Sequence, residues 1–298
     1  MGNGTKFAVA GLLASNGGRT MRKGFTLVEL LVVLGIIAML MALAAGGAMW
    51  AVNAGRRTSM GIEIAQLHEG VEAYKNATGD YPPNFRDANA LIRHIRRVYP
   101  RISPAEFNAV IDTSTSPPTV RPAMQLDEGE ALMFWLIGTR NDPVYPFGLT
   151  GGSNSERKNY FQVDDRRLVS LDGDPWPSMR SKYAKDTFYL YVDSRAYPYF
   201  GAVTAAGVYV NPPMNAEGDP HTARPYLDSS TPAPSFVKPT GFQILCAGQD
   251  GEFGPEPSAA ELQTYPGKSF PAGQNYTSAD SDNLTNFSDG RVLEDHIP

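Results

Sequence analysis

The chain has 298 residues, of which 42% are hydrophobic and 19% charged, which is typical of a folded protein and too apolar for a wholly disordered one. One cysteine excludes an internal disulfide framework, and the four histidines show no metal-ligand spacing. Residues 1–24 hold four Lys or Arg and no acid, whereas residues 25–298 hold 22 bases against 31 acids, so nucleic-acid binding is not expected of this acidic body.

The first predicted element is a membrane-spanning helix. Residues 30–52 form an apolar run of 23 residues without a charge, long enough as a helix to cross a hydrocarbon core of roughly 30 Å. Lipid offers the backbone no hydrogen bonds, so the segment must be helical. Arg22 and Lys23 precede the run and Arg56 and Arg57 follow it, and the positive charge of the leader favours a cytoplasmic N-terminus.

Glu29 interrupts the apolar sequence just before this run. A charge at mid-depth in a bilayer costs on the order of 2.5–3.5 kcal/mol, and less near the ends of the helix. Two interpretations remain open. Glu29 either lies at the interface and reaches water, or it pairs with a positive group inside an assembly.

Residues 23–30, with the sequence Lys-Gly-Phe-Thr-Leu-Val-Glu-Leu, resemble the prepilin signal of type IV pilins and type II secretion pseudopilins. The resemblance implies that prepilin peptidase cleaves between Gly24 and Phe25 and methylates the new N-terminal Phe25. It also implies that Glu29 is the acid at mature position five, whose carboxylate pairs with the N-terminal ammonium group of its own chain or of a neighbouring subunit. Met21 would begin a more compact leader than Met1.

An ordinary secretory signal peptide is the competing interpretation of this region. Residues 42–44 read Ala-Leu-Ala, which resembles a signal-peptidase site, and Arg22 and Lys23 would form the basic region before it. Two features oppose this interpretation: Glu29 lies inside the apolar part, and the apolar run continues beyond Ala44.

The helical pattern continues past the apolar run. Apolar residues recur at intervals of four and three along one face, at Met60, Ile64, Leu67, Val71 and Tyr74. Gly79 and the Pro82-Pro83 pair then end the helix. The sequence predicts one helix over residues 25–78, apolar all round in its first half and amphipathic in its second.

The remaining sequence predicts short helices followed by strands. Helices are expected around 91–98, after a capping box at Ser103 with Glu106, and over 127–136. Strands are expected at 187–192, 207–210 and 241–245, where β-branched and aromatic residues gather.

The predicted fold class is α+β and pilin-like. A long N-terminal helix, membrane-embedded in its first half, leads to a globular head with short helices and a small antiparallel sheet. The expected divisions are a leader at 1–24, the helix at 25–78 with a transmembrane and assembly segment at 25–52, and a periplasmic head at 79–298.

Two acidic, loop-like segments near the C-terminus form a candidate cation site. Asp250 lies in a Gly-rich segment, and Asp280, Asp282 and Asn283 follow later; oxygen ligands of this kind suit Ca²⁺, although the spacing is not that of an EF-hand, and two plain acidic turns explain it as well. Major pseudopilins end in two similar loops that together bind calcium. The resemblance implies that Asp250, Asp280 and Asn283 are ligands, with Asp282 an additional acid. Asn283 in place of an acid and the long insertion at 252–279 depart from that pattern.

The function implied is that of a structural subunit of a type II secretion pseudopilus or a type IV pilus-like filament. Its expected partners are prepilin peptidase, other pilin-like subunits, an inner-membrane assembly platform and the lipid bilayer. Its expected place is the bacterial inner membrane, with the N-terminus cytoplasmic and the head periplasmic, and the filament after assembly. A membrane-tethered enzyme or a periplasmic binding module is the alternative. No nucleophile-elbow, P-loop, zinc-protease or dinucleotide motif is present, and Cys246 is expected to be buried and inert, so a non-enzymatic role is predicted.

Overall fold

The computed structural model describes Met1 and residues 24–152, 155–170, 175–184, 187–200, 202–203, 209–210, 223–229, 235–254 and 267–298. The chain divides into two compact units, Met1–Ala51 and Val52–Pro298. The second unit is the head together with the last part of the long helix.

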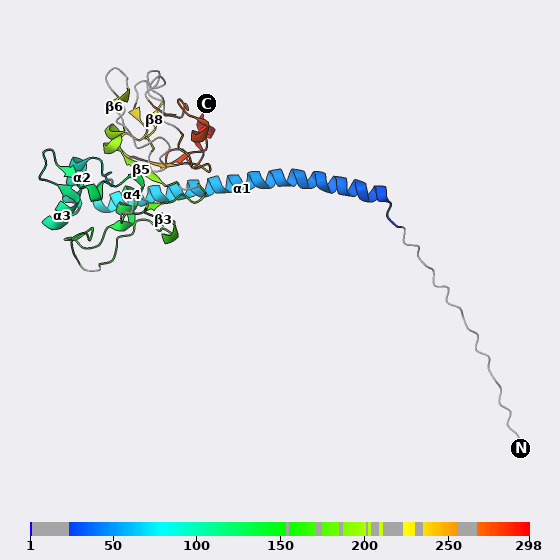
Figure 1. Ribbon diagram of the computed structural model, residues 1–298, viewed down its shortest axis with the longest axis horizontal. Coiled ribbons are helices and arrows are strands. Elements are labelled where there is room, and N and C mark those ends of the chain that lie inside the picture. The colour runs from blue at the N-terminus through cyan, green and yellow to red at the C-terminus, as the bar shows by residue number, and fades with distance from the viewer. Residues whose placement is uncertain are drawn as a thin grey trace. The chain divides into compact units, whose positions relative to one another are not determined.

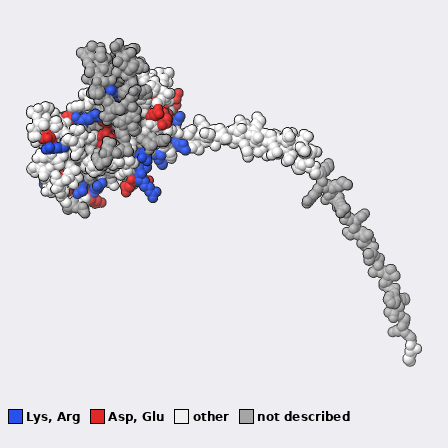
Figure 2. Space-filling view, viewed as in Figure 1, with Lys and Arg blue, Asp and Glu red and all other residues white. Residues whose placement is uncertain are grey.

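The long helix α1 runs from Leu27 to Thr78 without interruption and confirms the predicted element. In its first part every large apolar side chain from Leu27 to Val52 is exposed. An 18-residue window here has a mean hydropathy of 2.8, so α1 is long and apolar enough to cross a membrane. In Figure 2 this segment shows no Lys or Arg on its visible surface. An exposed apolar surface of this extent calls for lipid or other apolar helices around it.

The second part of α1 buries one face in the head. The predicted stripe of Met60, Ile64, Leu67, Val71 and Tyr74 is at most 2% exposed. Burying such side chains stabilises a fold by about 1.5–3 kcal/mol each. The ring of Tyr74 lies 5.8 Å from that of Trp135, and Glu63 binds Arg167 and the Tyr189 hydroxyl, so this part of the helix is a core element of the head.

Short helices, each with a side-chain cap, follow α1. α2 (Ala88–Val98) is capped by Asp87, α3 (Pro104–Val110) by Ser103, and α4 (Glu128–Met133) by Asp127. All three were expected from their sequence signals. The capping box at α4 is complete.

The capping box predicted at Ser103 forms only in part. The Ser103 hydroxyl accepts from the Glu106 N–H at 3.1 Å, but the Glu106 carboxylate does not return to Ser103. It accepts instead from the N–H groups of Phe147, Leu149 and Thr150 at 2.9–3.1 Å. The local pattern correctly predicted where the helix starts. The carboxylate instead binds a loop about 40 residues later, because the N–H groups of that loop lacked other partners.

The core is centred on a π-helical turn, Phe134–Gly138, which continues directly from α4. Trp135 is fully buried, and its indole N–H donates to the carbonyl of Pro83 at 2.8 Å. Aromatic rings surround it at centroid distances of 4.9–6.1 Å, namely those of Tyr74, Phe85, His94, Phe134 and Phe147. The helical stretch predicted over 127–136 is therefore core, and it ends near Gly138.

The main sheet is antiparallel, in the order β12-β10-β5. β5 (Leu190–Asp193) and β10 (Phe242–Cys246) confirm two of the predicted strands, and β12 (Leu284–Thr285) joins the other edge of β10. β7 (Tyr209–Val210) is the described part of the third prediction, since residues 207 and 208 lie outside the described residues.

The strands form several small sheets, and not all are antiparallel. β11 (Ser269–Phe270) pairs in parallel with β8 (Leu227–Asp228), which pairs antiparallel with β9 (Ser235–Phe236). The predicted α+β class with a small antiparallel sheet is confirmed by β12-β10-β5. The additional small sheets were not predicted, because two-residue strands leave almost no periodicity to read. The other pairs are β1 (Ile111–Asp112) with β2 (Thr119–Val120), β3 (Leu168–Val169) with β4 (Ser178–Met179), and β6 (Ala202–Val203) with β7.

The packing of α1 against the C-terminal loop generates a prediction about Gly61. A Cβ at Gly61 would lie 2.8 Å from the carbonyl oxygen of Gly290, whereas a Cβ at Gly55 would meet nothing within 4 Å. We expect Gly61→Val to destabilise the head by about 1–3 kcal/mol, the usual cost of overpacking. Gly55→Val, one and a half turns earlier in the same helix, should be neutral or slightly stabilising.

The measurement is thermal unfolding of both full-length variants in detergent. Equal melting temperatures for Gly61→Val and Gly55→Val would contradict the close contact between the helix and Gly290.

Candidate functional site

The residues of the predicted cleavage site are exposed at the start of α1. Gly24, Phe25 and Thr26 precede the helix in a non-helical stretch, and the Phe25 side chain is 84% exposed. A protease needs an extended, accessible backbone, and the bond between Gly24 and Phe25 meets that condition. The basic residues of the leader, up to Lys23, lie outside the described residues.

Glu29 is held by a partner that the sequence analysis missed. Its Oε2 accepts from both the N–H and the hydroxyl of Thr26 at 2.8 Å, and its own N–H donates to the Thr26 hydroxyl at 3.2 Å. This is a reciprocal capping box, and the signal for it was the Thr-x-x-Glu spacing before the apolar run. The negative carboxylate thus sits at the positive end of the helix dipole. Within one chain, Thr26 and the start of the helix therefore stabilise the Glu29 carboxylate. This environment adds to the two expected from the sequence, namely water and the positive charge of a neighbouring subunit.

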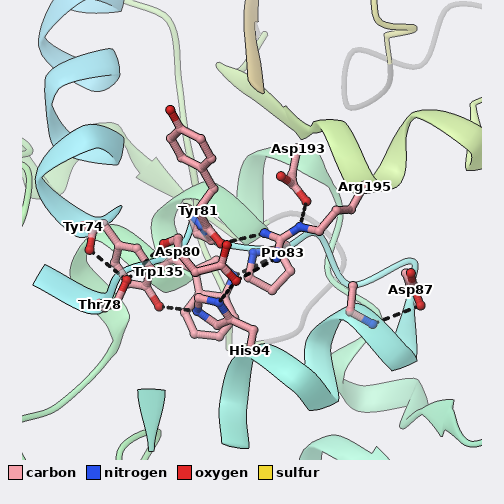
Figure 3. Close-up of polar contacts among 12 residues, drawn as sticks. Tyr74, Thr78, Asp80, Tyr81, Pro83, Asp87, His94, Trp135, Asp193 and Arg195 are labelled. Carbon is pink, nitrogen blue, oxygen red and sulfur yellow. Dashed lines mark hydrogen bonds and ion pairs between the residues drawn. The ribbon is translucent and has the colours of Figure 1, made fainter. Parts of the chain in front are cut away.

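A second polar cluster holds the turn that follows α1, and Figure 3 shows it in close-up. Gly79 ends the helix with φ +81°, and the chain enters the segment 80–87. Asp80 accepts from Arg195 at 2.9 Å and contacts His94 Nδ1 at 3.2 Å, while His94 Nε2 lies 2.7 Å from the Tyr74 hydroxyl. α1, α2 and the segment after β5 therefore meet at one carboxylate.

Backbone carbonyls of this segment are bound by side chains from the head. Arg195 donates to the carbonyl of Tyr81 at 2.6 Å, and the Tyr191 hydroxyl to that of Pro82 at 2.7 Å. Asn84 bonds both the N–H of Asp193 and the carbonyl of Tyr191, as a neighbouring strand would. Prolines cannot donate, so side chains satisfy a buried turn that has no ladder of its own.

The charges in this cluster are set by burial and by their neighbours. Burial opposes ionisation of Asp80, but the hydrogen bond from His94 and the charge of Arg195 outweigh it and lower the pKa of Asp80 to about 2. Burial lowers the pKa of His94 below its usual 6.5, although Asp80 partly opposes this. His94 is therefore neutral in the folded head near pH 7.

The hydrogen-bonded series Asp80, His94 and Tyr74 has the residue types of a catalytic proton relay, but its geometry indicates that it stabilises the fold. The Tyr74 side chain is fully buried, and burial raises its pKa well above 10. His94 is also fully buried, beside Trp135. A substrate cannot reach the hydroxyl at the end of this chain, so the cluster fixes the turn after α1.

The two acidic C-terminal loops come together, with Asp282 at their centre. Asp282 Oδ2 accepts from the N–H groups of Gln249 at 2.6 Å and Asp250 at 3.4 Å. Its Oδ1 is buried and has no hydrogen-bond partner among the described residues. Burial, with the nearby carboxylates of Asp282 and Glu252, raises the pKa of Asp250. A carboxylate whose pKa is raised by neighbouring carboxylates lies in an environment that suits a cation.

The other two predicted ligands are placed differently. Asp280 is fully buried; its Oδ1 accepts from Lys268 at 2.5 Å and its Oδ2 from the N–H and hydroxyl of Thr277. Asn283 Oδ1 accepts from the N–H of Gly248 at 3.1 Å and so joins the two loops. Among the described residues no group of three or more His, Cys, Asp or Glu side chains is arranged to hold a metal ion. Residues 255–266 of the insertion lie outside them.

Cys246 lies in β10 and is fully buried, as expected. Burial raises the pKa of its thiol to about 12, so the reactive thiolate is absent near neutral pH.

Comparison with known families identifies the N-terminal signal. Residues 19–45 match the family described as the prokaryotic N-terminal methylation motif. The matched stretch includes Gly24, Phe25 and Glu29 and the first turns of α1. The chain thus carries the processing signal of type IV pilin-like and pseudopilin precursors, followed by a long apolar helix. This signal implies processing by prepilin peptidase and assembly with other pilin subunits. No curated protein and no solved structure matches the chain.

Because His94 is buried and neutral, we expect the free energy of unfolding of the head to depend on pH through this residue. The unfolded chain takes up a proton at the ordinary pKa near 6.5, whereas the folded head resists it, so the free energy of unfolding falls as the pH drops below about 6.5. In His94→Gln this loss between pH 7 and pH 5 should be smaller, although the variant is less stable at pH 7.

The measurement is urea unfolding of full-length protein in detergent at both pH values, followed by Trp fluorescence. Burial raises the pKa of Asp193 to about 6, which changes stability in the opposite sense, but Asp193 is present in both proteins and its contribution cancels in the comparison. An equal loss of stability in the two proteins would show that His94 is not the acid-sensitive group.

Proposed function

We propose that this protein is a structural subunit of a type II secretion pseudopilus or a closely similar type IV pilus-like filament. The observation that carries the proposal is the match to the N-terminal methylation motif, on a helix whose first part has a wholly exposed apolar surface. The precursor lies in the bacterial inner membrane with its N-terminus in the cytoplasm and its head in the periplasm, and an inner-membrane assembly platform extracts it into the filament. The two acidic C-terminal loops favour the secretion branch.

The apolar part of α1 has two successive environments in this mechanism. In the bilayer, lipid covers the exposed side chains of residues 27–52; in the filament, the same side chains pack against the helices of other subunits. Cleavage after Gly24 leaves the ammonium of Phe25 one turn before Glu29. The carboxylate, already held by Thr26, then pairs with its own or a neighbour's ammonium as apolar surroundings strengthen the attraction.

N-terminal mass spectrometry of the mature protein tests the assignment. We expect the mature chain to begin at N-methylated Phe25. In the same strain Glu29→Leu should be processed normally but give at least tenfold fewer filaments, since a lost ion pair in an apolar environment removes well over 1.4 kcal/mol.

Glu69→Leu is the matched control, because Glu69 is an exposed acid of α1 inside the head and is expected to leave assembly unchanged. An unmodified terminus at Ala45 or Gly46 would refute the processing step and indicate an ordinary secretory signal. Normal filament yield from Glu29→Leu would refute the role of the carboxylate.

We further propose that a calcium ion joins the two C-terminal loops. Asp250 and Asp282 would hold it, and the buried, unpartnered Oδ1 of Asp282 supports this assignment. Asn283 would order the loops through Gly248, whereas Asp280 is engaged by Lys268. The ion would neutralise the negative charges of the two adjacent carboxylates.

Calcium should stabilise the full-length protein in detergent by mass action, by about 2.7 kcal/mol at one hundred times the Kd. We expect Asp250→Ala to remove most of the calcium-dependent rise in melting temperature while changing the melting temperature in chelator much less. Glu156→Ala removes an exposed acid elsewhere and serves as the control. The same decrease for Asp250→Ala with calcium and with chelator would contradict the site.

A further inference from the structure

The outer face of α2 forms a basic surface at one end of the head. It consists of four exposed arginines, Arg93, Arg96, Arg97 and Arg101, and none of them forms an ion pair with a described Asp or Glu. The single acid of residues 88–110 is Glu106, which is buried and bound by N–H groups. The positive charge of this surface is therefore not neutralised by a direct ion pair within the described part of the chain.

The position of the basic surface is fixed by the C-terminal end of α1. A Cβ at Gly79 would lie 3.0 Å from an Arg97 guanidinium nitrogen, so Arg97 covers the residue that ends the helix. Beside the arginines, α2 and α3 border a hollow of about 640 Å³, lined by Arg96, Tyr99, Ile102 and Phe107 among others. The surface thus combines exposed cations with an apolar recess.

An acidic surface lies at the other end of the head. Asp289, Glu294 and Asp295 are exposed and form no ion pair with a described residue, and Arg291 is the one Lys or Arg in residues 289–298. Gly290 lies against Gly61 of α1. Ile297, next to these acids, is 44% exposed and offers an apolar side chain.

The two surfaces are separated along the direction of α1. Gly61 in α1 and Gly79, which directly follows the last residue of α1, are 18 residues apart, which is about 27 Å along the helix axis. Figure 1 shows the same arrangement, with α2 and α3 at one end of the head and the C-terminus at the other. When two copies point the same way, the basic end of one copy faces the acidic end of the next. The two ends then attract each other.

From this complementarity we infer that the basic surface of one copy receives the acidic surface of the next. Residues 294–297 of the second copy lie across α2, with Ile297 in the recess and its neighbouring acids on the arginines. The contact joins two different faces, so each copy keeps one of each free and the array continues, as a filament requires. The inference rests on the proposed function, and it names the residues through which heads in that filament touch.

Cysteine cross-linking of the full-length chain in its membrane tests the contact directly. Arg93→Cys combined with Glu294→Cys should give a ladder of covalent dimers, trimers and longer species with a short bismaleimide. Cys246 is fully buried and does not compete. Either single variant should stay monomeric, and so should Arg93→Cys with Gln162→Cys, an exposed position on neither surface. Monomers alone from the double variant, or dimers from a single variant, would overturn the inference.

Charge reversal gives a second readout. Arg93→Glu with Arg96→Glu, and separately Glu294→Lys with Asp295→Lys, should each lower filament yield about tenfold, whereas all four changes in one chain should restore most of it. The yield should also fall with added salt, because exposed charges are screened. Normal yield from either pair, or no recovery in the combined chain, would overturn the contact. If wild-type filaments with methylated Phe25 form and no ladder appears, only this inference fails; if no wild-type filaments form, the proposed function fails.

Discussion

The structure depends on one constraint: a single continuous helix must be stable in two different solvents. Backbone hydrogen bonds inside a helix need nothing from outside, so α1 can pass from lipid to water without a change of conformation. Only the side chains distinguish the two halves. Residues 27–52 are apolar on every face and exposed, whereas residues 60–74 bury one stripe and leave the other faces polar. The head forms around that stripe, and the apolar half is free for lipid and then for neighbouring helices.

The ends of α1 show how such a helix is fixed. At the start, Thr26 and Glu29 cap each other, which places a carboxylate where the helix dipole favours negative charge. At the other end Gly79 turns the chain, and Asp80 joins His94 to Arg195. In the proposed filament, the first arrangement holds the carboxylate that pairs with an ammonium group. In the second, His94 and the Tyr74 hydroxyl beyond it are fully buried and closed to substrate, so it braces the head although its residue types are those of catalysis.

Charge is distributed over the protein in a way that suits polymerisation. The apolar part of α1 has a single carboxylate near its start. The head carries exposed arginines on and after α2 at one end of its part of α1, and exposed acids near the C-terminus at the other end. Apolar packing has little directionality, so helices alone would bundle in many registers. In the proposed contact, paired charges on the heads select one register, because like charges would meet in the others.

The sequence alone determined the helix, its apolar and amphipathic halves, its end at Gly79, the processing signal and the capped starts of α3 and α4, because each depends on residues within one or two turns of each other. The sequence also encodes the Thr26–Glu29 capping box in a Thr-x-x-Glu spacing, which an interpretation of Glu29 by its charge alone overlooks. The tertiary structure decided the rest. Glu106 left its predicted cap for a distant loop, Asp282 rather than Asp280 came to face Asp250, and two-residue strands paired in several small sheets. These outcomes depend on which buried N–H groups lack a partner once distant segments of the chain have packed together. A local sequence pattern contains no information about such distant groups.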